Sequence, residues 1–298
     1  MKERRSVHTL FRFPYRLENN FMPAGEGTEI MSYSLSHVGQ VRDDNQDAVK
    51  LCDPDSGISE VSGYLYGIAD GMGGYAHGGV ASSVALETFF ETYYAANGIS
   101  PLQKFRVSIQ NANLSVYQTA HRVGAGRMGT TLTAVSILGS ELYIGHVGDS
   151  RAYLIRDGST RCLTNDHTRV GELVRMRVLS PDKVRSHSQR SVLNKCLGLE
   201  LFVQPDIFKM PAQNGDTIIL CTDGVWSVIE DEEFGALAHS ASNLEDLGQR
   251  IFTTTMERNS DDNVSIVAIH LNRLANVNDT SVAIRTSALS RLFRKFAR

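Results

Sequence analysis

The sequence has few cysteines and no long hydrophobic run. Its four cysteines are widely spaced and include no Cys-x-x-Cys pair, which argues against a disulfide framework or a zinc-thiolate site (Cys52, Cys162, Cys196 and Cys221). No segment approaches the roughly 18 apolar residues that cross a bilayer, and no secretory hydrophobic region follows the basic start at residues 1–5. We therefore expect a soluble, cytoplasmic protein in a reducing compartment.

An excess of positive charge is also missing. Lysine and arginine number 30 against 33 acidic residues, which gives a formal net charge of −3. Because binding to nucleic-acid phosphates needs a clustered basic surface, nucleic acid is not a predicted partner. The 42% of hydrophobic residues in a chain of 298 is enough to build a sizeable core.

Residues 31–272 carry the hydrophobic pattern of one large domain, with an extension on each side. Residues 1–30 lack a sustained period and are predicted to be an N-terminal extension. Residues 273–298 are a basic tail whose larger apolar residues fall on one stripe of a helix (Leu289, Leu292, Phe293 and Phe296). Two interpretations stay open for this tail: a frayed or disordered terminal helix, or a segment that docks weakly on an acidic partner or an anionic membrane surface.

Within the domain, alternating apolar residues predict strands, and spacings of three and four predict helices. The predicted strands are 33–41, 48–51, 64–69, 130–138, 141–147, 151–156, 217–222 and 264–271, and the predicted helices are 80–93, 102–119, 231–238 and 244–256. Two runs of strands, each followed by a pair of helices, favour an α+β layered sandwich with sheets inside and helices outside.

Residues 165–197 interrupt this pattern with a polar stretch that is rich in arginine. One interpretation is a solvated insertion, and the other is a mobile flap that faces the substrate. The sequence leaves both open.

Acidic residues stand at the ends of strand-like runs in four places, and a fifth acidic cluster, at residues 43–47, precedes them. The four are Asp70, Asp149, Asp223 and Asp262. A single Asp-Gly pair at a strand end is ordinary turn chemistry, but several can converge at one rim of a sheet. There they would repel one another unless a cation held them. Since oxygen ligands suit Mg²⁺ and Mn²⁺, the pattern predicts a hard-metal site.

Seven short motifs in order along residues 32–272 resemble a known family. They are Arg42-x-x-Asn45-Gln46-Asp47, Asp70-Gly71-Met72-Gly73-Gly74, Met128-Gly129-Thr130-Thr131, Gly148-Asp149-Ser150-Arg151, Asp166-His167, Thr222-Asp223-Gly224 and Asp262-Asn263-Val264-Ser265. The set is similar to the bacterial branch of the metal-dependent PP2C (PPM) Ser/Thr protein phosphatases. This resemblance implies a four-layer α-β-β-α sandwich, two central antiparallel β-sheets flanked by helix pairs, with a Mn²⁺ or Mg²⁺ cluster between the sheet ends.

The resemblance also implies roles for individual residues. Asp70 would bridge two metal ions, the Gly71 carbonyl would bind the second, and Asp223 and Asp262 would complete the first. Asp47 would act directly or through a bound water, Asp149 would help to hold a third, weaker ion, and Arg42 would bind the substrate phosphate. A water that bridges the two core ions would then attack phosphorus directly, with no phosphoenzyme.

Two positions depart from patterns seen in the family. Gln46 stands where a glutamate is frequent, and its uncharged amide predicts weaker metal binding on that side. Met72 stands where animal relatives carry a histidine that protonates the leaving group, so solvent or a bound water would take that part. We interpret His77 and His167 as structural histidines and Trp226 as a packing residue.

The predicted function is hydrolysis of phosphoserine and phosphothreonine in proteins, in opposition to a Ser/Thr protein kinase. One alternative is a pseudophosphatase, a phosphoprotein-binding module in which Gln46 has weakened the metal site. Retention of Asp70, Asp223 and Asp262 argues against it, because a dead site has no need of mutually repelling carboxylates. Another alternative is hydrolysis of a small phosphate ester.

Overall fold

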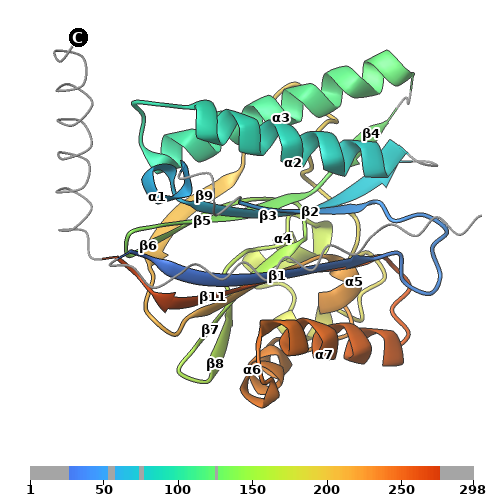
Figure 1. The fold of residues 1–298 in the computed structure, drawn as a ribbon. Helices are drawn as coiled ribbons and strands as arrows, with labels where there is room; N and C mark the ends of the chain where they lie inside the picture. The colour runs from blue at the N-terminus through green and yellow to red at the C-terminus, as the bar shows by residue number, and fades with distance from the viewer. Residues whose placement is uncertain (1–26, 53–57, 74–76, 125–126, 276–298) are drawn as a thin grey trace, which may run out of the picture.

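The computed structural model describes residues 27–52, 58–73, 77–124 and 127–275 of the chain. The predicted N-terminal extension and basic C-terminal tail lie outside these residues, except for residues 27–30 and 273–275 at their inner ends. Two β-sheets lie face to face between two layers of helices (Figure 1). This arrangement confirms the predicted four-layer α-β-β-α sandwich.

Both sheets are antiparallel throughout. The first has the order β1-β11-β10-β7-β8 (Glu29–His37, Val264–Arg273, Thr217–Cys221, Arg151–Arg156 and Ser159–Cys162). The second has the order β2-β3-β5-β6-β9 (Asp47–Leu51, Tyr64–Gly73, Leu132–Leu138, Glu141–Val147 and Asp206–Pro211), and β4 (Met128–Thr130) pairs with the end of β3.

Helix pairs cover the outer face of each sheet (Figure 1). The pair α2 (His77–Ala95) and α3 (Pro101–Val123) covers the second sheet, and the pair α6 (Asp231–Ser240) and α7 (Leu244–Glu257) covers the first. Shorter helices lie in the connections: α1 (Ile58–Ser62), α4 (Arg169–Arg175), η2 (Pro181–Lys183) and α5 (Asp223–Trp226). No helix in the described ranges is both long and apolar enough to cross a bilayer.

Three buried layers hold the sandwich together. Phe89 and Phe105 pack between the first helix pair and its sheet, Ile68 and Ile218 meet between the two sheets, and Phe234 lies under the second helix pair. All five side chains are fully buried. Truncating one of these phenylalanines to alanine is expected to cost about 3–5 kcal/mol, because it leaves a cavity in a packed layer.

The predicted strand that ends at Ala69 is wrong in its extent, since β3 runs on through Asp70 to Gly73. The reason is β4, whose residues pair with Gly71–Gly73 and so continue the ladder where an isolated Asp-Gly would turn. The predicted strand 217–222 is also shorter in the structure, because Asp223 begins helix α5 instead of following a strand as a turn.

Several short elements were not predicted from the sequence. These are α1, β4, β8, β9, α5 and the helices inside residues 165–197. β8 and β9 are edge strands with partly exposed side chains, so their sequences show little alternation of apolar residues.

Candidate active site

A pocket of about 840 Å³ opens at one rim of the sandwich, and all the predicted site residues except Asp47 line it. It is lined by Arg42, Asp70, Asp149, Asp223 and Asp262, among others. They come from loops and strand ends of both sheets, which the antiparallel registers bring to the same end. The structure therefore brings together the carboxylates that the sequence placed at separate strand ends.

Asp47 lies beside this pocket instead of in its lining. It begins β2 and stands directly opposite Asp70 in the β2–β3 register. The Thr222 hydroxyl donates a hydrogen bond of 2.9 Å to the Asp47 carboxylate. The two carboxylates are thus a cross-strand pair, an arrangement that is destabilising when both are charged and nothing lies between them.

Hydrogen bonds with Thr130, the last residue of β4, and with Thr131 fix the backbone of Asp70. Its N–H donates to the Thr131 hydroxyl at 2.9 Å, and its carbonyl accepts from the Thr130 hydroxyl at 2.9 Å. At Gly71 a Cβ atom would come within 2.0 Å of the Gly78 carbonyl oxygen, so only glycine fits there. The Gly-Thr-Thr segment at 129–131 thus holds the site residues in place.

The electrostatics of the pocket are those of crowded acids. Burial, followed by the charges of neighbouring carboxylates, raises the pKa of Asp47 to about 7. The same causes raise the pKa of Asp223 to about 6 and hold the pKa values of Asp70 and Asp149 well above the usual range. A cation in the pocket would remove this penalty, because it favours the charged form of every carboxylate around it.

The donor chemistry fits a hard divalent metal. Carboxylate oxygens and backbone carbonyls are the ligands that Mg²⁺ and Mn²⁺ prefer. The acidic side chains share the pocket without converging on one point: across the described residues no three His, Cys, Asp or Glu side chains form a ready-made ligand set. Instead the Arg42 guanidinium donates to the Asp262 carboxylate at 2.8 Å.

Gln46 and Met72, the two departures from the family pattern, both line the pocket. The backbone carbonyl of Gln46 accepts hydrogen bonds from the Gly71 N–H at 3.1 Å and from the Ser82 hydroxyl at 2.6 Å. Its position is therefore set by backbone contacts that an amide or a carboxylate side chain would leave unchanged.

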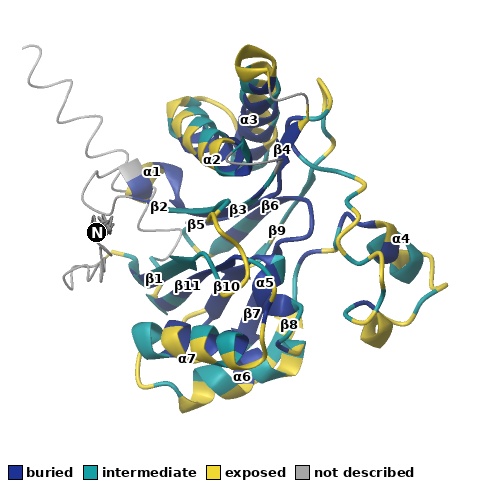
Figure 2. Ribbon diagram, turned by 90° about the vertical axis from the view of Figure 1, so that its right-hand side faces the viewer, coloured by how far each residue is buried: buried dark blue, intermediate teal, exposed yellow. Residues whose placement is uncertain are grey.

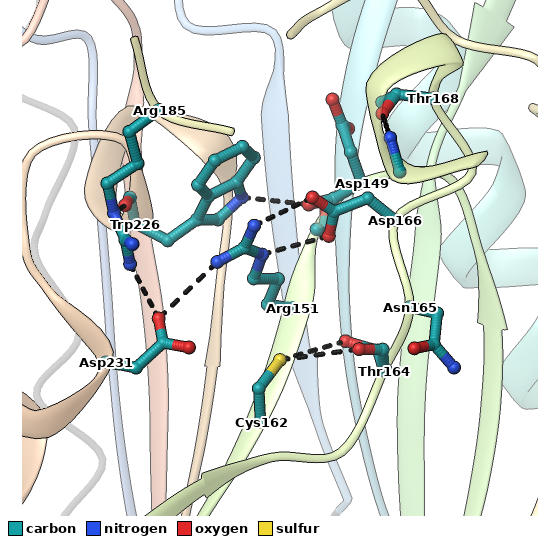
Figure 3. A network of polar contacts seen from close by, with 12 residues as sticks. Asp149, Arg151, Cys162, Thr164, Asn165, Asp166, Thr168, Arg185, Trp226 and Asp231 are labelled. Carbon is teal, nitrogen blue, oxygen red and sulfur yellow. Dashed lines mark hydrogen bonds and ion pairs between the residues drawn. The ribbon is translucent and has the colours of Figure 1, made fainter. Parts of the chain in front are cut away.

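Asp149 is almost fully buried, and its backbone belongs to a network that the sequence analysis missed (Figure 3). The Trp226 indole N–H donates to the Asp149 carbonyl at 2.8 Å. The Arg151 guanidinium lies 3.8 Å from the centre of the Trp226 ring and binds Asp166 through two hydrogen bonds of 2.9 and 2.7 Å. Trp226 is buried, as predicted, but it also positions the turn that carries Asp149.

His167 is buried and accepts a hydrogen bond of 3.1 Å from the Gly148 N–H, in agreement with a structural role. Its ring stacks on that of His146, with 4.8 Å between the centroids. His77 begins α2 and is partly exposed. Its assignment as a structural histidine stays a prediction.

The 165–197 segment borders the pocket. Ser191 and Leu193 line it, and Arg190 approaches Asp261 to 3.9 Å. Much of the segment is exposed, and α4 with its flanking loops projects from the side of the sandwich (Figure 2). The segment thus has the exposure of a solvated insertion and also faces the site.

Fold and site together define a class: a four-layer sandwich whose two sheets present an acidic, oxygen-rich pocket at one rim. Comparison with known proteins places the chain within that class. The sequence pattern of the family described as protein phosphatase 2C matches residues 36–268. The chain belongs to this family, and it is an enzyme of the protein phosphatase class, as the motifs predicted.

The relatives are bacterial. A putative protein phosphatase 2C-type of Streptococcus pyogenes serotype M6 is 30% identical over 245 residues, which cover 80% of this chain and 97% of the relative. The serine/threonine phosphatase PstP/Ppp of Mycobacterium tuberculosis superposes with a TM-score of 0.73 at 30% identity, covering 82% of this chain and 99% of that one. A structure of the PstP catalytic domain in complex with two manganese ions has a TM-score of 0.71 at 27% identity, with the same coverages.

Proposed function

We propose that the chain hydrolyses phosphoserine and phosphothreonine in proteins and opposes a serine/threonine protein kinase in the cytoplasm. The observation that carries this proposal is the pocket in which Arg42 stands among Asp70, Asp149, Asp223 and Asp262. The Arg42 guanidinium can bind a phosphate, and the carboxylates around it are suitable ligands for metal ions. Relatives named as serine/threonine phosphatases support the choice of substrate class.

The proposed metal site holds two Mn²⁺ or Mg²⁺ ions and a third, weaker one. The proposed donors are Asp70 for both core ions, the Gly71 carbonyl for one, Asp223 and Asp262 for the other, Asp47 directly or through water, and Asp149 for the third. Bound by these donors, the ions would supply positive charge to the phosphate and would make a water acidic enough to act as the nucleophile. The manganese-bound relative supports two core ions and leaves the choice of metal open.

Arg42 is the residue that we assign to the substrate phosphate. Its side chain is 54% exposed at the mouth of the pocket, so it is free to leave Asp262 when a phosphate arrives. A guanidinium binds phosphate through two parallel N–H groups and offsets the negative charge that builds up in the transition state. Until a phosphate binds, the ion pair with Asp262 keeps the Arg42 guanidinium beside the carboxylates.

Two other functions compete with this proposal. A pseudophosphatase would bind phosphoproteins without turnover, and Gln46, which faces the pocket without a charge, is the observation in its favour. A phosphatase of small esters would act equally well on esters and on phosphopeptides.

The test is phosphate release from a phosphothreonine peptide by the full chain, with EDTA, Mg²⁺ or Mn²⁺ and with Asp70→Ala as control. We expect turnover that requires a divalent metal and is lost in the variant. Peptide binding without turnover in any metal would favour the pseudophosphatase. Equal rates on para-nitrophenyl phosphate and the peptide would favour the small-ester enzyme.

A further inference from the structure

Arg185 lies in the 165–197 segment, and its guanidinium is held by the body of the domain. It donates to the carbonyl of Trp226 at 2.8 Å and to the carbonyl of Ile229 at 3.0 Å. It also pairs with the Asp231 carboxylate at 2.6 Å. Only 16% of the Arg185 side chain is exposed, although many residues around it face solvent. Such a set of acceptors fixes the guanidinium in both position and orientation.

The acceptors of Arg185 belong to the network that reaches Asp149 (Figure 3). Asp231 also accepts from the Tyr153 hydroxyl at 2.9 Å. Trp226, whose carbonyl binds Arg185, donates through its indole to the Asp149 carbonyl. One side chain therefore ties the projecting segment to the same helix α5 that positions a wall of the pocket.

A series of tight turns leads from Arg185 to the pocket. The N–H of His187 donates to the Val184 carbonyl at 3.1 Å, and the N–H of Arg190 donates to the His187 carbonyl at 3.1 Å. The N–H of Val192 then donates to the Gln189 carbonyl at 3.2 Å. Ser191, which lies within the last turn, and Leu193, which directly follows it, line the pocket. Beyond Val192 the wall is paired with residues 167–169: the Arg169 N–H donates to the Val192 carbonyl at 2.9 Å, and the Asn194 N–H donates to the His167 carbonyl at 2.7 Å. Because the turns are hydrogen-bonded one after another, Arg185 fixes the near end of this wall, and the pairing with residues 167–169 fixes its far end.

On this side the segment is held by apolar contacts as well as by Arg185. A second pocket of about 370 Å³ separates α4 and η2 from the start of α6. It is lined by charged side chains from both sides, including Arg175, Asp182, Glu230 and Glu232. Next to this hollow, Val184 is buried in the apolar layer under α6 and α7, and Arg185 follows it. The segment is thus attached here through two buried valines, Val170 and Val184, and through the multiply bonded Arg185.

From these contacts we infer that Arg185 is a positioning residue for protein substrates, a latch that sets the Ser191–Leu193 wall at the mouth of the site. The inference rests on the proposed function and names a determinant of it. A phosphopeptide must lie against this wall to bring its phosphate to Arg42, whereas a small ester reaches the pocket without it. Loss of the latch therefore raises KM for large substrates and leaves the chemistry intact.

The experiment compares Arg185→Ala, Arg185→Gln and Arg185→Lys with the wild-type chain on a phosphothreonine peptide and on para-nitrophenyl phosphate in Mn²⁺. Lys183→Ala is the matched control, because Lys183 lies two residues away, is 65% exposed and carries the same charge. We expect kcat/KM for the peptide to fall by at least about tenfold in the alanine and glutamine variants, mainly through KM. The lysine variant regains part of it, and ester turnover stays within about twofold.

Equal losses on peptide and ester would overturn the inference, because they would mean a damaged catalytic centre. Peptide kinetics of all Arg185 variants equal to wild type would overturn it as well, while the proposed function would stand. A wild-type chain that leaves the peptide untouched in every metal would overturn the proposed function and the inference together. If Arg185→Ala does not fold, the glutamine variant, which keeps the aliphatic stem, decides the result.

Discussion

Removing one carboxylate from the pocket should stabilise the metal-free protein while it abolishes activity. Asp223 is the best choice, because burial and the charge of Asp262 raise its pKa from the ordinary 3.8 to about 6. A carboxyl group whose pKa is higher in the folded state lowers stability at every pH above that value, and the penalty fades as the pH falls toward the unfolded value. The difference between the two values corresponds to about 3 kcal/mol at pH 7.

The gain expected for Asp223→Asn is smaller, about 1–2 kcal/mol in EDTA, because the side chain partly meets solvent and the amide is also desolvated. For a domain of this size that gain corresponds to a rise in Tm of about 2–4 °C per kcal/mol. Saturating Mn²⁺ should stabilise the wild-type protein and have little effect on the variant, which has lost a donor. Asp261→Asn is the control, since its side chain is 72% exposed, and it should change stability by less than about 0.5 kcal/mol.

The assay is urea denaturation with EDTA and with Mn²⁺, at pH 7 and at pH 5, beside phosphate release from a phosphothreonine peptide. In EDTA the wild-type protein should become more stable as the pH falls from 7 to 5, because protonation removes the unfavourable charge of Asp223. The Asp223→Asn variant lacks this charge and should gain less. A variant that is less stable than wild type in EDTA at pH 7 would refute the reasoning that the carboxylates repel one another in the empty pocket.

Three further predictions concern the surroundings of the site. Arg151→Met leaves Asp166 buried and unpaired, and urea denaturation should show a loss of about 3–5 kcal/mol; an unchanged midpoint would contradict the importance of the pair. Burial lowers the pKa of His146 to about 3, so its contribution to stability is constant above pH 6.5 and should fall by up to about 1.4 kcal/mol per pH unit below it. His146→Gln should flatten this slope in unfolding measured between pH 7 and 5, and an equal slope would contradict the assignment. Asp149→Ala should leave turnover of para-nitrophenyl phosphate largely intact and weaken the response of Trp226 fluorescence to Mn²⁺; a loss of turnover as deep as in Asp223→Asn would undo the separation of the core ions from the third.

The order of the layers and the clustering of the carboxylates could be predicted because both depend on patterns among residues that are close in sequence. Helical and alternating spacings identify long elements, and four acids of the pocket stand beside a Gly or Asn at the end of a strand-like run: Asp70, Asp149, Asp223 and Asp262. The short edge strands β8 and β9 escaped because their half-exposed residues show little alternation. The predicted strand 64–69 was shorter than β3 because the last residues of β3 pair with β4, which lies about 60 residues further along the chain.

The network behind Asp149 could not be predicted from the sequence, for a physical reason. Arg151 finds Asp166 fifteen positions away, and Trp226 donates to a carbonyl 77 positions away. Only the fold brings these groups together. The one available signal was that Arg151 directly follows the Gly-Asp-Ser motif, inside a strand where an unpaired charge would be costly.

The sheet order has a consequence for how the enzyme is made. β11 is the last strand of the domain, and it lies between β1, the first strand, and β10. A nascent chain that has not yet released β11 from the ribosome therefore holds β1 without its partner, and it also lacks Asp262 from the loop before β11. Because such long-range pairing forms late, we expect the complete pocket, with Asp262 in place, to form only after β11 has left the ribosome. Activity begins only when the final strand has closed the sheet.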